Sequence, residues 1–309
     1  MAVIDAMPKN TSRGILLKLA QTLLFSLMYA MIKLAGQNTP VGEVVFLRCF
    51  VALIPLLIFT HYTVGFRAAI RTQKPFYHFL RSAIGSTSMF CNFLAVQLLP
   101  LVTVTAFGFL SPVFVVILAA LILHEKVGPW RWGAVVVGFG GILLMLEPHG
   151  GLEALAALKM STGIVFALAF AFLSSFVNIL IRQMSKTERS EAIVFYFMSW
   201  GAIIGAIVMA FQHPVFDGRA VFWLTACGLI GGFGQIALTY CYRYAEPSLL
   251  APFDYTSMVW AMILGLFVFG EIPEPMVLVG SAVVIAAGLV IVWRERHHRQ
   301  LRRTAAPAK

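Results

Sequence analysis

Charged residues are scarce in this sequence of 309 residues. Only 12% of the residues are Asp, Glu, Lys or Arg, whereas 60% are hydrophobic and the mean hydropathy is +0.88. A soluble domain carries about 25% charged residues, so this chain has roughly half the charge that a water-facing surface requires. A segment that crosses a bilayer needs about 20 mostly apolar residues, and such runs follow one another here with short breaks. The scarcity of charge therefore excludes a soluble protein and predicts one that lies mostly in lipid.

The sequence also lacks motifs that hold a metal, a cofactor or a disulfide framework. All four cysteines fall within apolar runs, without the paired spacing of disulfides or metal ligands. The glycine clusters 138–141 and 231–234 follow no expected strand and do not have the spacing of a nucleotide-binding loop. His124-Glu125 has no second histidine at zinc-protease spacing. We therefore expect no cofactor and no metal, and we interpret the glycine clusters as faces for close helix packing.

The net charge of +10 does not predict a nucleic-acid partner, because of where the basic residues lie. With the N-terminus taken as cytoplasmic, 18 of the 23 Lys and Arg, Lys18 among them, fall on the inner side. Two fall on the outer side and three within spans. Basic residues in short loops face the cytoplasm, so both termini are expected there, in a bacterial cell inner membrane. The basic tail 294–309 is expected to anchor this side or to contact anionic membrane lipids.

Apolar runs divide the chain into ten expected membrane-spanning helices, joined by short connections with turn residues. The expected fold is therefore an all-α polytopic membrane protein. Its domains are a first repeat (1–147), an outer connecting loop (148–160), a second repeat (161–293) and the basic tail. The expected spans are 14–36, 43–61, 76–98, 102–123, 130–147, 161–183, 191–211, 219–242, 247–269 and 274–293.

The two halves of the sequence repeat each other. Residues 12–15 match 161–164 at an offset of 149, and the same offset takes Ser26 to Ser175. Later in each half, Ser111 corresponds to Ser257 and Glu125 to Glu271 at an offset of 146. One repeat holds five spans, and an odd number reverses orientation. The halves are therefore predicted to be inverted copies, a plan typical of secondary transporters with a substrate site near the midplane.

Four ionisable residues lie within the expected spans, where a charge is costly and is by default a candidate for function. Asp254 lies beside Pro252, which should kink the ninth span, as Pro112 should kink the fourth. Asp254 is expected either to serve substrate or proton coupling, or to pair with Arg48 or Arg81. The two arginines are expected either to bind a substrate carboxylate or phosphate, or to reach the lipid headgroups. Lys33, near an outer helix end, is interpreted as an interfacial anchor.

Uncharged polar and aromatic residues of the spans form a second group of candidates. Amides within a bundle often hydrogen-bond helix to helix, so both a structural and a ligand role stay open. The aromatic residues are expected either to line an amphipathic pocket or to pack in the core. Glu125 and Glu271 each close a span and are interpreted as boundary residues. The amides are Asn92, Gln97, Asn178, Gln183 and Gln235, and the aromatic residues are Phe107, Phe109, Tyr255 and Trp260.

The segments 110–148 and 250–291, which close the two repeats, resemble the closing helices of the EamA repeat. This is the ten-helix branch of the drug/metabolite transporter superfamily, and the likeness extends from about residue 14 to 293. Residues 74–81 and Arg131-Trp132 also resemble bacterial S-adenosylmethionine uptake transporters, and amino-acid exporters share much of that pattern. The resemblance implies a cavity between the halves lined by spans one, three, four, six, eight and nine. The lining residues it implies are Arg81, Asn92, Phe109, Asn178, Gln235, Asp254, Tyr255 and Trp260.

These observations favour a secondary transporter over other membrane proteins. We expect alternating access, in which the two halves rock about a midplane site to move a small polar or amphipathic metabolite. The alternative is a membrane-embedded lipid-linked group transferase. Such enzymes cluster acids or histidines at one membrane face, which this sequence does not do. A monomer and a homodimer are both open.

Overall fold

The computed structural model of the chain describes residues 11–63, 65–66, 70–121, 129–147, 161–184, 187–212, 217–245 and 247–304. All the regular elements in these ranges are helices. The connecting loop 148–160, Glu125 and the last five residues of the basic tail lie outside them. The helices are α1 (Thr11–Ala35), α2 (Val41–Thr63), α4 (Pro75–Leu98), α5 (Leu101–Gly108), α6 (Ser111–Leu121), α7 (Pro129–Leu146), α9 (Thr162–Met184), α10 (Ser190–Gln212), α11 (Gly218–Tyr244), α12 (Pro247–Asp254), α13 (Thr256–Phe269) and α14 (Pro275–Thr304).

Each expected span corresponds to one helix or to a broken pair. Seven segments in the described ranges are long and apolar enough to cross a membrane. The apolar parts of α7 and α14 are shorter, and α4 carries many polar side chains. The chain is therefore an all-helical, multi-pass membrane protein, whereas a total of ten crossings stays a prediction. The last helix is longer than expected, because α14 continues to Thr304 through most of the basic tail.

The helix breaks predicted in the fourth and ninth spans are confirmed. The fourth span divides into α5 and α6, with Pro112 in the first turn of α6, where no backbone N–H is needed. The ninth span divides into α12 and α13 at Tyr255, three residues after Pro252. Pro129 and Pro275 begin α7 and α14 for the same reason as Pro112.

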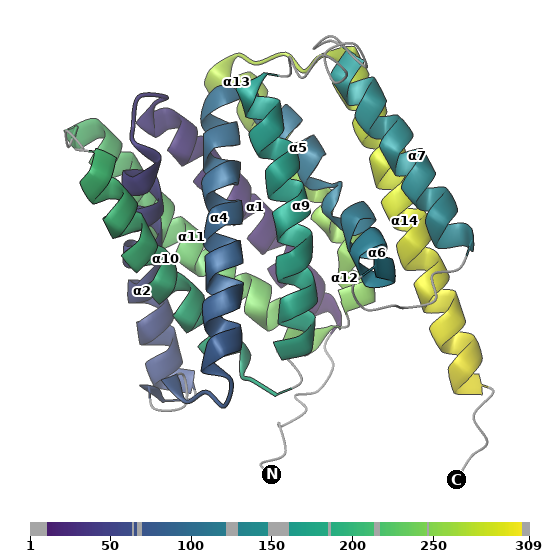
Figure 1. The fold of residues 1–309 in the computed structure, drawn as a ribbon, viewed down its shortest axis with the longest axis horizontal. Coiled ribbons are helices and arrows are strands. Elements are labelled where there is room, and N and C mark those ends of the chain that lie inside the picture. Colours follow the sequence, from purple (N-terminus) through teal and green to yellow (C-terminus); the bar gives the residue numbers. More distant parts are fainter. Residues whose placement is uncertain are drawn as a thin grey trace.

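Helices at equivalent places in the two halves make equivalent contacts. α1 packs on α11, and its equivalent α9 packs on α4, the equivalent of α11. α2 packs on α11, and its equivalent α10 packs on α4. In addition, α2 packs on α10 and α7 packs on α14, so each of these two pairs joins a helix to its own equivalent. A two-fold axis between inverted halves produces this pattern, so the contacts fit the two-repeat architecture. α7 and α14 lie side by side at one edge of the bundle (Figure 1).

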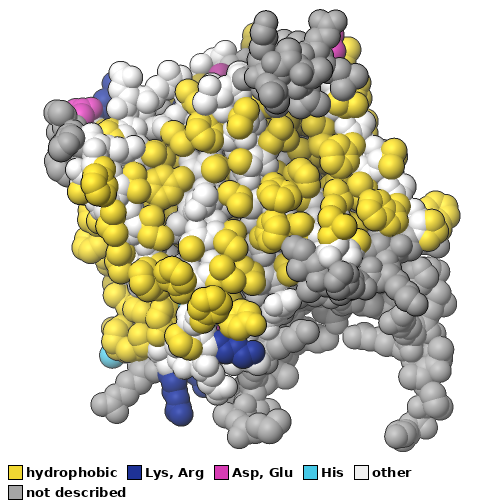
Figure 2. Space-filling view, viewed as in Figure 1, with side chains coloured by type: hydrophobic (Ala, Val, Ile, Leu, Met, Phe, Trp, Pro, Cys, Tyr) yellow, Lys and Arg dark blue, Asp and Glu magenta, His cyan; other side chains and the backbone are white. Residues whose placement is uncertain are grey.

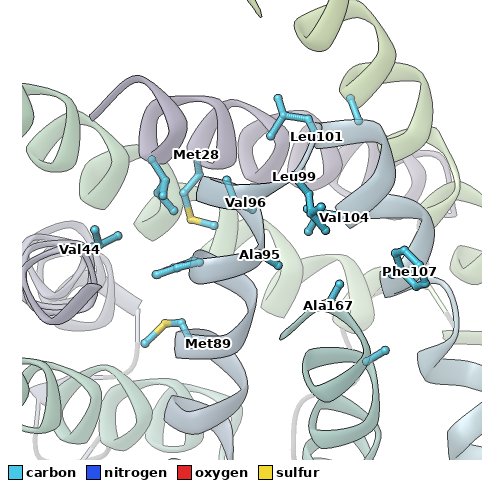
Figure 3. Close-up of a cluster of buried hydrophobic side chains, with 14 of the residues drawn as sticks. Met28, Val44, Met89, Ala95, Val96, Leu99, Leu101, Val104, Phe107 and Ala167 are labelled. Atoms are coloured by element: carbon cyan, nitrogen blue, oxygen red, sulfur yellow. The ribbon is translucent and has the colours of Figure 1, made fainter. Parts of the chain in front are cut away.

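The outside and inside of the bundle are both largely apolar, as lipid requires. Hydrophobic side chains cover the middle of the face in Figure 2, and the charged side chains visible there lie toward its edges. Figure 3 shows part of the buried core, where side chains from α1, α2, α4, α5 and α9 gather. α1 begins and α14 ends at the same end of the bundle, hereafter the terminal end, and α1 ends at the distal end (Figure 1).

Candidate functional site

The densest row of buried polar side chains runs along α4. Arg81, Ser82, Ser86 and Asn92 are each at most 5% exposed. At about 100° per residue, these four positions fall within roughly 140° of the helix circumference, which places them toward one side of the helix. The hydroxyls of Ser82 and Ser86 are buried without a hydrogen-bond partner. An uncompensated polar group is costly in an apolar interior, so this side of α4 is a candidate for a role beyond packing.

Asn92 connects this row to α1. Its Nδ2 donates to the Tyr29 hydroxyl oxygen at 2.9 Å, while its Oδ1 is buried without a partner. The sequence alone does not identify Tyr29 as a candidate, because nothing in its sequence neighbourhood distinguishes it from a packed aromatic residue.

The two arginines reach adjacent residues of α10. The Arg81 guanidinium stacks over the Phe197 ring, 3.7 Å from its centroid. Nη1 of Arg48 donates to Sδ of Met198 at 3.1 Å and to Sγ of Cys49 at 3.7 Å. Both arginines are buried, so of the two alternatives given for them, contact with the lipid headgroups is wrong.

Asp254 forms an ion pair with Lys18 at 2.5 Å, so the expected pairing with Arg48 or Arg81 is wrong. The Lys18 side chain is 2% exposed and that of Asp254 is 46% exposed. Lys18, counted above with the inner-side charges, is therefore a buried cation of the bundle. A sequence signal existed, because Lys18, Thr22, Tyr29 and Lys33 recur at multiples of three or four residues on one side of α1.

Hydroxyl groups of α9 and α1 lie at the two helix breaks. At the first break, Ser111 accepts from Ser174 at 3.0 Å and from Nδ2 of Asn178 at 3.3 Å. At the second break, the hydroxyls of Thr22 and Thr256 are 2.8 Å apart. The first helix of each half thus binds the broken span of the other half, which places both breaks between the halves.

The aromatic candidates and the remaining amides divide between these breaks and structural roles. Phe109 and Tyr255, one from each break, meet edge to face with centroids 5.1 Å apart. Nε1 of Trp260 is buried without a partner, and Gln235 lies half-buried in α11. Phe107 is a core residue. Gln97 donates to the carbonyl oxygens of Gly36 and Thr39, and Gln183 is exposed.

Lys33 and Glu271 form a clasp at the distal end instead of serving as an anchor and a boundary residue. Lys33 pairs with Oε1 of Glu271 and donates to the Leu99 carbonyl oxygen at 2.8 Å. Oε2 of Glu271 accepts from the Leu101 N–H at 3.1 Å. Gly270, at a φ of +66°, makes the left-handed turn that brings Glu271 back toward the bundle. The clasp joins α1 and α13 to the loop between α4 and α5.

A groove of about 350 Å³ lies between α6, α7 and α9, away from the polar residues. Its lining includes Phe114, Phe139, Leu143 and Phe172 and is entirely apolar. None of the expected site residues contributes to it. A wholly apolar surface has no group to orient a polar solute, so we do not place the site there.

Comparison with known proteins identifies the family. The model of the EamA-like transporter family matches residues 12–147 and 161–293. The S-adenosylmethionine uptake transporter of Rickettsia prowazekii is 28% identical over 93% of this chain and 95% of its own. The pseudopaline exporter of Pseudomonas aeruginosa is 26% identical over 90% and 95%. A crystal structure with 18% identity has a TM-score of 0.63 and covers 93% of this chain and 98% of its own, which shows a shared fold. The chain therefore belongs to the EamA-like transporter family, and it is a membrane transporter of small molecules and not an enzyme.

Proposed function

We propose that the protein is a secondary transporter that moves a small polar or amphipathic metabolite across the cell inner membrane by alternating access. The cargo is an amino acid or a derivative, of the size and polarity of S-adenosylmethionine. The observation that carries the proposal is a symmetric set of helix contacts that is broken at one end of the bundle.

The contacts group the helices into two lobes that each mix both halves of the sequence. α1 packs on α11, α12 and α13, and α2 packs on α11, which gives the first lobe. α9 packs on α4, α5 and α6, and α10 packs on α4, which gives the second lobe. The moving bodies that we propose are these lobes, in place of the two sequence halves expected above. The helix breaks lie where the lobes face each other.

α2 and α10 join the two lobes through a contact between equivalent helices. Apart from this pair, the lobes meet at the distal end but not equivalently at the terminal end. α5 packs on α13 and α1 packs on α4 near the clasp of Lys33 and Glu271. Their equivalents are α12 with α6 and α9 with α11, and these pairs show no comparable packing among the described residues. Symmetric lobes with one closed end are what one state of an alternating-access carrier looks like. With the terminal end cytoplasmic, this is the inward-facing state.

The proposed cargo path runs from the terminal end to the breaks. Near the breaks, the side chain of Asp254 on one lobe is 46% exposed, and Asn178 on the other lobe is exposed. We propose that they, with Arg81, Asn92, Phe109, Gln235, Tyr255, Trp260 and Arg48, line the path. The two kinked spans supply the unwound backbone at which transporters bind polar solutes.

Reconstitution tests the proposal. Purified protein in proteoliposomes preloaded with unlabelled S-adenosylmethionine, or with an unlabelled amino acid from a panel, should accumulate the same solute in labelled form by counterflow. The recovered solute should be chemically unchanged. A solute that is modified instead of moved, or the absence of counterflow across the whole panel, would contradict the proposal.

A further inference from the structure

Two of the four cations resolved inside the described bundle have no carboxylate partner. Lys18 is matched by Asp254, and Lys33 by Glu271. Arg48 and Arg81, at 4% and 5% exposed, contact no carboxylate among the described residues. A guanidinium stays protonated in proteins, and a buried charge without a counter-charge is strongly unfavourable. A counter-charge from outside the resolved contacts would remove this cost.

The contacts that the arginines do make leave donors unused. Nε and Nη1 of Arg81 are buried without a hydrogen-bond acceptor, and the face of the Phe197 ring accepts only the positive charge. Nε of Arg48 is also without an acceptor, and its Nη1 points at two sulfur atoms, which are weak acceptors. The environment thus provides soft packing around both guanidinium groups but almost no acceptors.

The two groups approach one place from different helices. Arg48 comes from α2 and Arg81 from α4, and they end at Met198 and Phe197, neighbours in α10. A glycine backbone lies against each guanidinium group, because a Cβ on Gly85 would be 3.6 Å from Nη1 of Arg81 and one on Gly231 would be 3.6 Å from Nε of Arg48. Packing is close at both glycines, since the same Cβ atoms would lie 3.0 Å from the Phe197 ring and 2.7 Å from Sδ of Met28. The partnerless hydroxyls of Ser82 and Ser86 follow Arg81 on α4.

We infer that Arg48 and Arg81 together form the anion subsite of the carrier, and that the cargo bears a carboxylate that binds there. The inference rests on the proposed function and gives its cargo a chemical class. The planar fork of a guanidinium matches a carboxylate in a bidentate geometry, and two forks neutralise and fully hydrogen-bond one or two carboxylates. A cargo with only positive charge is excluded, because it would enter beside two unneutralised cations.

The first test measures binding, without transport. Purified protein in nanodiscs of uncharged lipid is heated with sodium salts of glutamate, succinate and S-carboxymethylcysteine, and with their amides, at constant ionic strength. A ligand of the native state raises the unfolding temperature. We expect at least one carboxylate to raise it and its amide to have no effect. Chloride and inorganic phosphate are tested in parallel, and stabilisation by these ions alone, or by no carboxylate, would overturn the inference.

Variants locate the effect. Arg48→Met and Arg81→Met should each weaken the active carboxylate roughly 10- to 100-fold, the range expected for losing a charge-assisted hydrogen-bonding group. The affinity of Arg81→Lys for the carboxylate should lie between those of the wild type and Arg81→Met, because lysine keeps the charge but lacks the planar guanidinium fork. Arg219→Met, on an exposed arginine at the start of α11, is the matched control and should leave affinity unchanged.

Stability of the unliganded protein separates a binding role from a structural one. Replacing unpaired buried charges by apolar groups of similar volume removes an unfavourable contribution to the free energy of folding. The double variant Arg48→Met, Arg81→Met should therefore unfold at the same or a higher temperature than the wild type. A large drop would identify the arginines as structural and overturn the inference. Counterflow of the same carboxylates distinguishes the two proposals. Wild-type binding without movement contradicts the carrier alone, whereas movement that survives in the double variant contradicts the anion subsite alone.

Discussion

Two lysines of α1 are neutralised in different ways, which separates their roles. Lys18 and Lys33 are 15 residues apart, about 22 Å along the helix. Lys33 is held by a carboxylate and a backbone carbonyl oxygen, so its contacts fix the position of neighbouring chain segments. Lys18 pairs with a carboxylate that is 46% exposed, so one partner of this pair faces accessible space and the other does not. We therefore propose that Asp254, the exposed partner, exchanges its lysine for a proton or a cargo group.

Asp254→Asn tests this reading of the pair. The change leaves the Lys18 ammonium group buried without a counter-charge, so the thermal unfolding temperature should fall. Adding Lys18→Met removes the orphaned charge and should restore most of the stability. Transport should stay low in the double variant if Asp254 serves coupling or cargo. Proton-dependent counterflow at the wild-type level in Asp254→Asn would end the coupling role.

Glu188 provides a pH-dependent contribution to stability outside the spans. Burial raises the pKa of this carboxyl, but the Gln73 N–H at 2.9 Å and the His78 ring at 3.3 Å hold the pKa below its ordinary value of 4.5. A lowered native pKa stabilises the fold above the ordinary value, and the contribution is lost as pH falls through the native one.

Glu188→Gln should therefore remove a contribution of about 1–3 kcal/mol to the free energy of unfolding at neutral pH. Between pH 5 and 3.5 the stability of the wild type should fall faster than that of the variant, so the two curves converge. Thermal unfolding across this range checks the prediction, with the exposed Glu274→Gln as control. Parallel curves for the wild type and Glu188→Gln would assign the acid sensitivity to other groups.

At the scale of helices, the sequence predicts where two spans break, but it does not predict which side chains form ion pairs between helices. Pro112 and Pro252 act through the local backbone, so their effect on the fourth and ninth spans can be inferred without knowing the fold. Which way a helix faces cannot be inferred as easily, because lipid makes the outer face as apolar as the core. Lys18 lies 236 residues before Asp254. No local pattern brings those two residues together, and the depth of Arg48 and Arg81 in their spans left open whether they face the bundle or reach the headgroups.

The α7–α14 pair illustrates how glycine sets the approach of two helices. A Cβ on Gly280 would lie 2.6 Å from the Gly141 carbonyl oxygen, and a Cβ on Gly141 would lie 2.8 Å from that of Gly280. Neither backbone can move without separating the helices. Small residues at such a crossing allow the close packing that replaces the hydrophobic effect within lipid.

Gly280→Val should therefore separate α7 from α14 and lower the free energy of unfolding by roughly 1–3 kcal/mol, the usual penalty of overpacking. Gly133→Val is the matched control, because a Cβ there meets nothing within 4 Å. Thermal unfolding in detergent compares the two variants. Equal losses would show that the cost comes from the helix backbone and not from the crossing.

At the scale of the whole molecule, the proposed alternating-access cycle gives the clasp and the inter-lobe contacts a role in selecting which end is open. The clasp of Lys33 and Glu271 joins one lobe to the loop between α4 and α5 of the other. It forms only while the distal ends are together, so it favours the state seen here by the free energy of its charge-assisted bonds. A contact present in one state and absent in the other shifts the populations by that amount.

Weakening the clasp should therefore open the distal end and close the terminal end together. In a background with the four cysteines replaced, Asn178→Cys reports on the terminal side of the second lobe, and Thr105→Cys reports on α5 near the clasp. With a water-soluble maleimide, we expect the first reporter to react faster than the second. Adding Glu271→Gln should speed labelling at position 105 and slow it at position 178, each by roughly tenfold if one charge-assisted bond is lost.

The pattern of the two rates decides between switching and local loosening. Opposite changes require one equilibrium that links both ends, as alternating access does. Faster labelling at both positions would mean that the clasp only stabilises the fold, and unchanged rates would mean that helix packing alone closes the distal end. Glu274→Gln, three residues beyond the clasp and exposed, should leave both rates unchanged. Because the readout needs no cargo, it tests the motion of the lobes independently of what the protein carries.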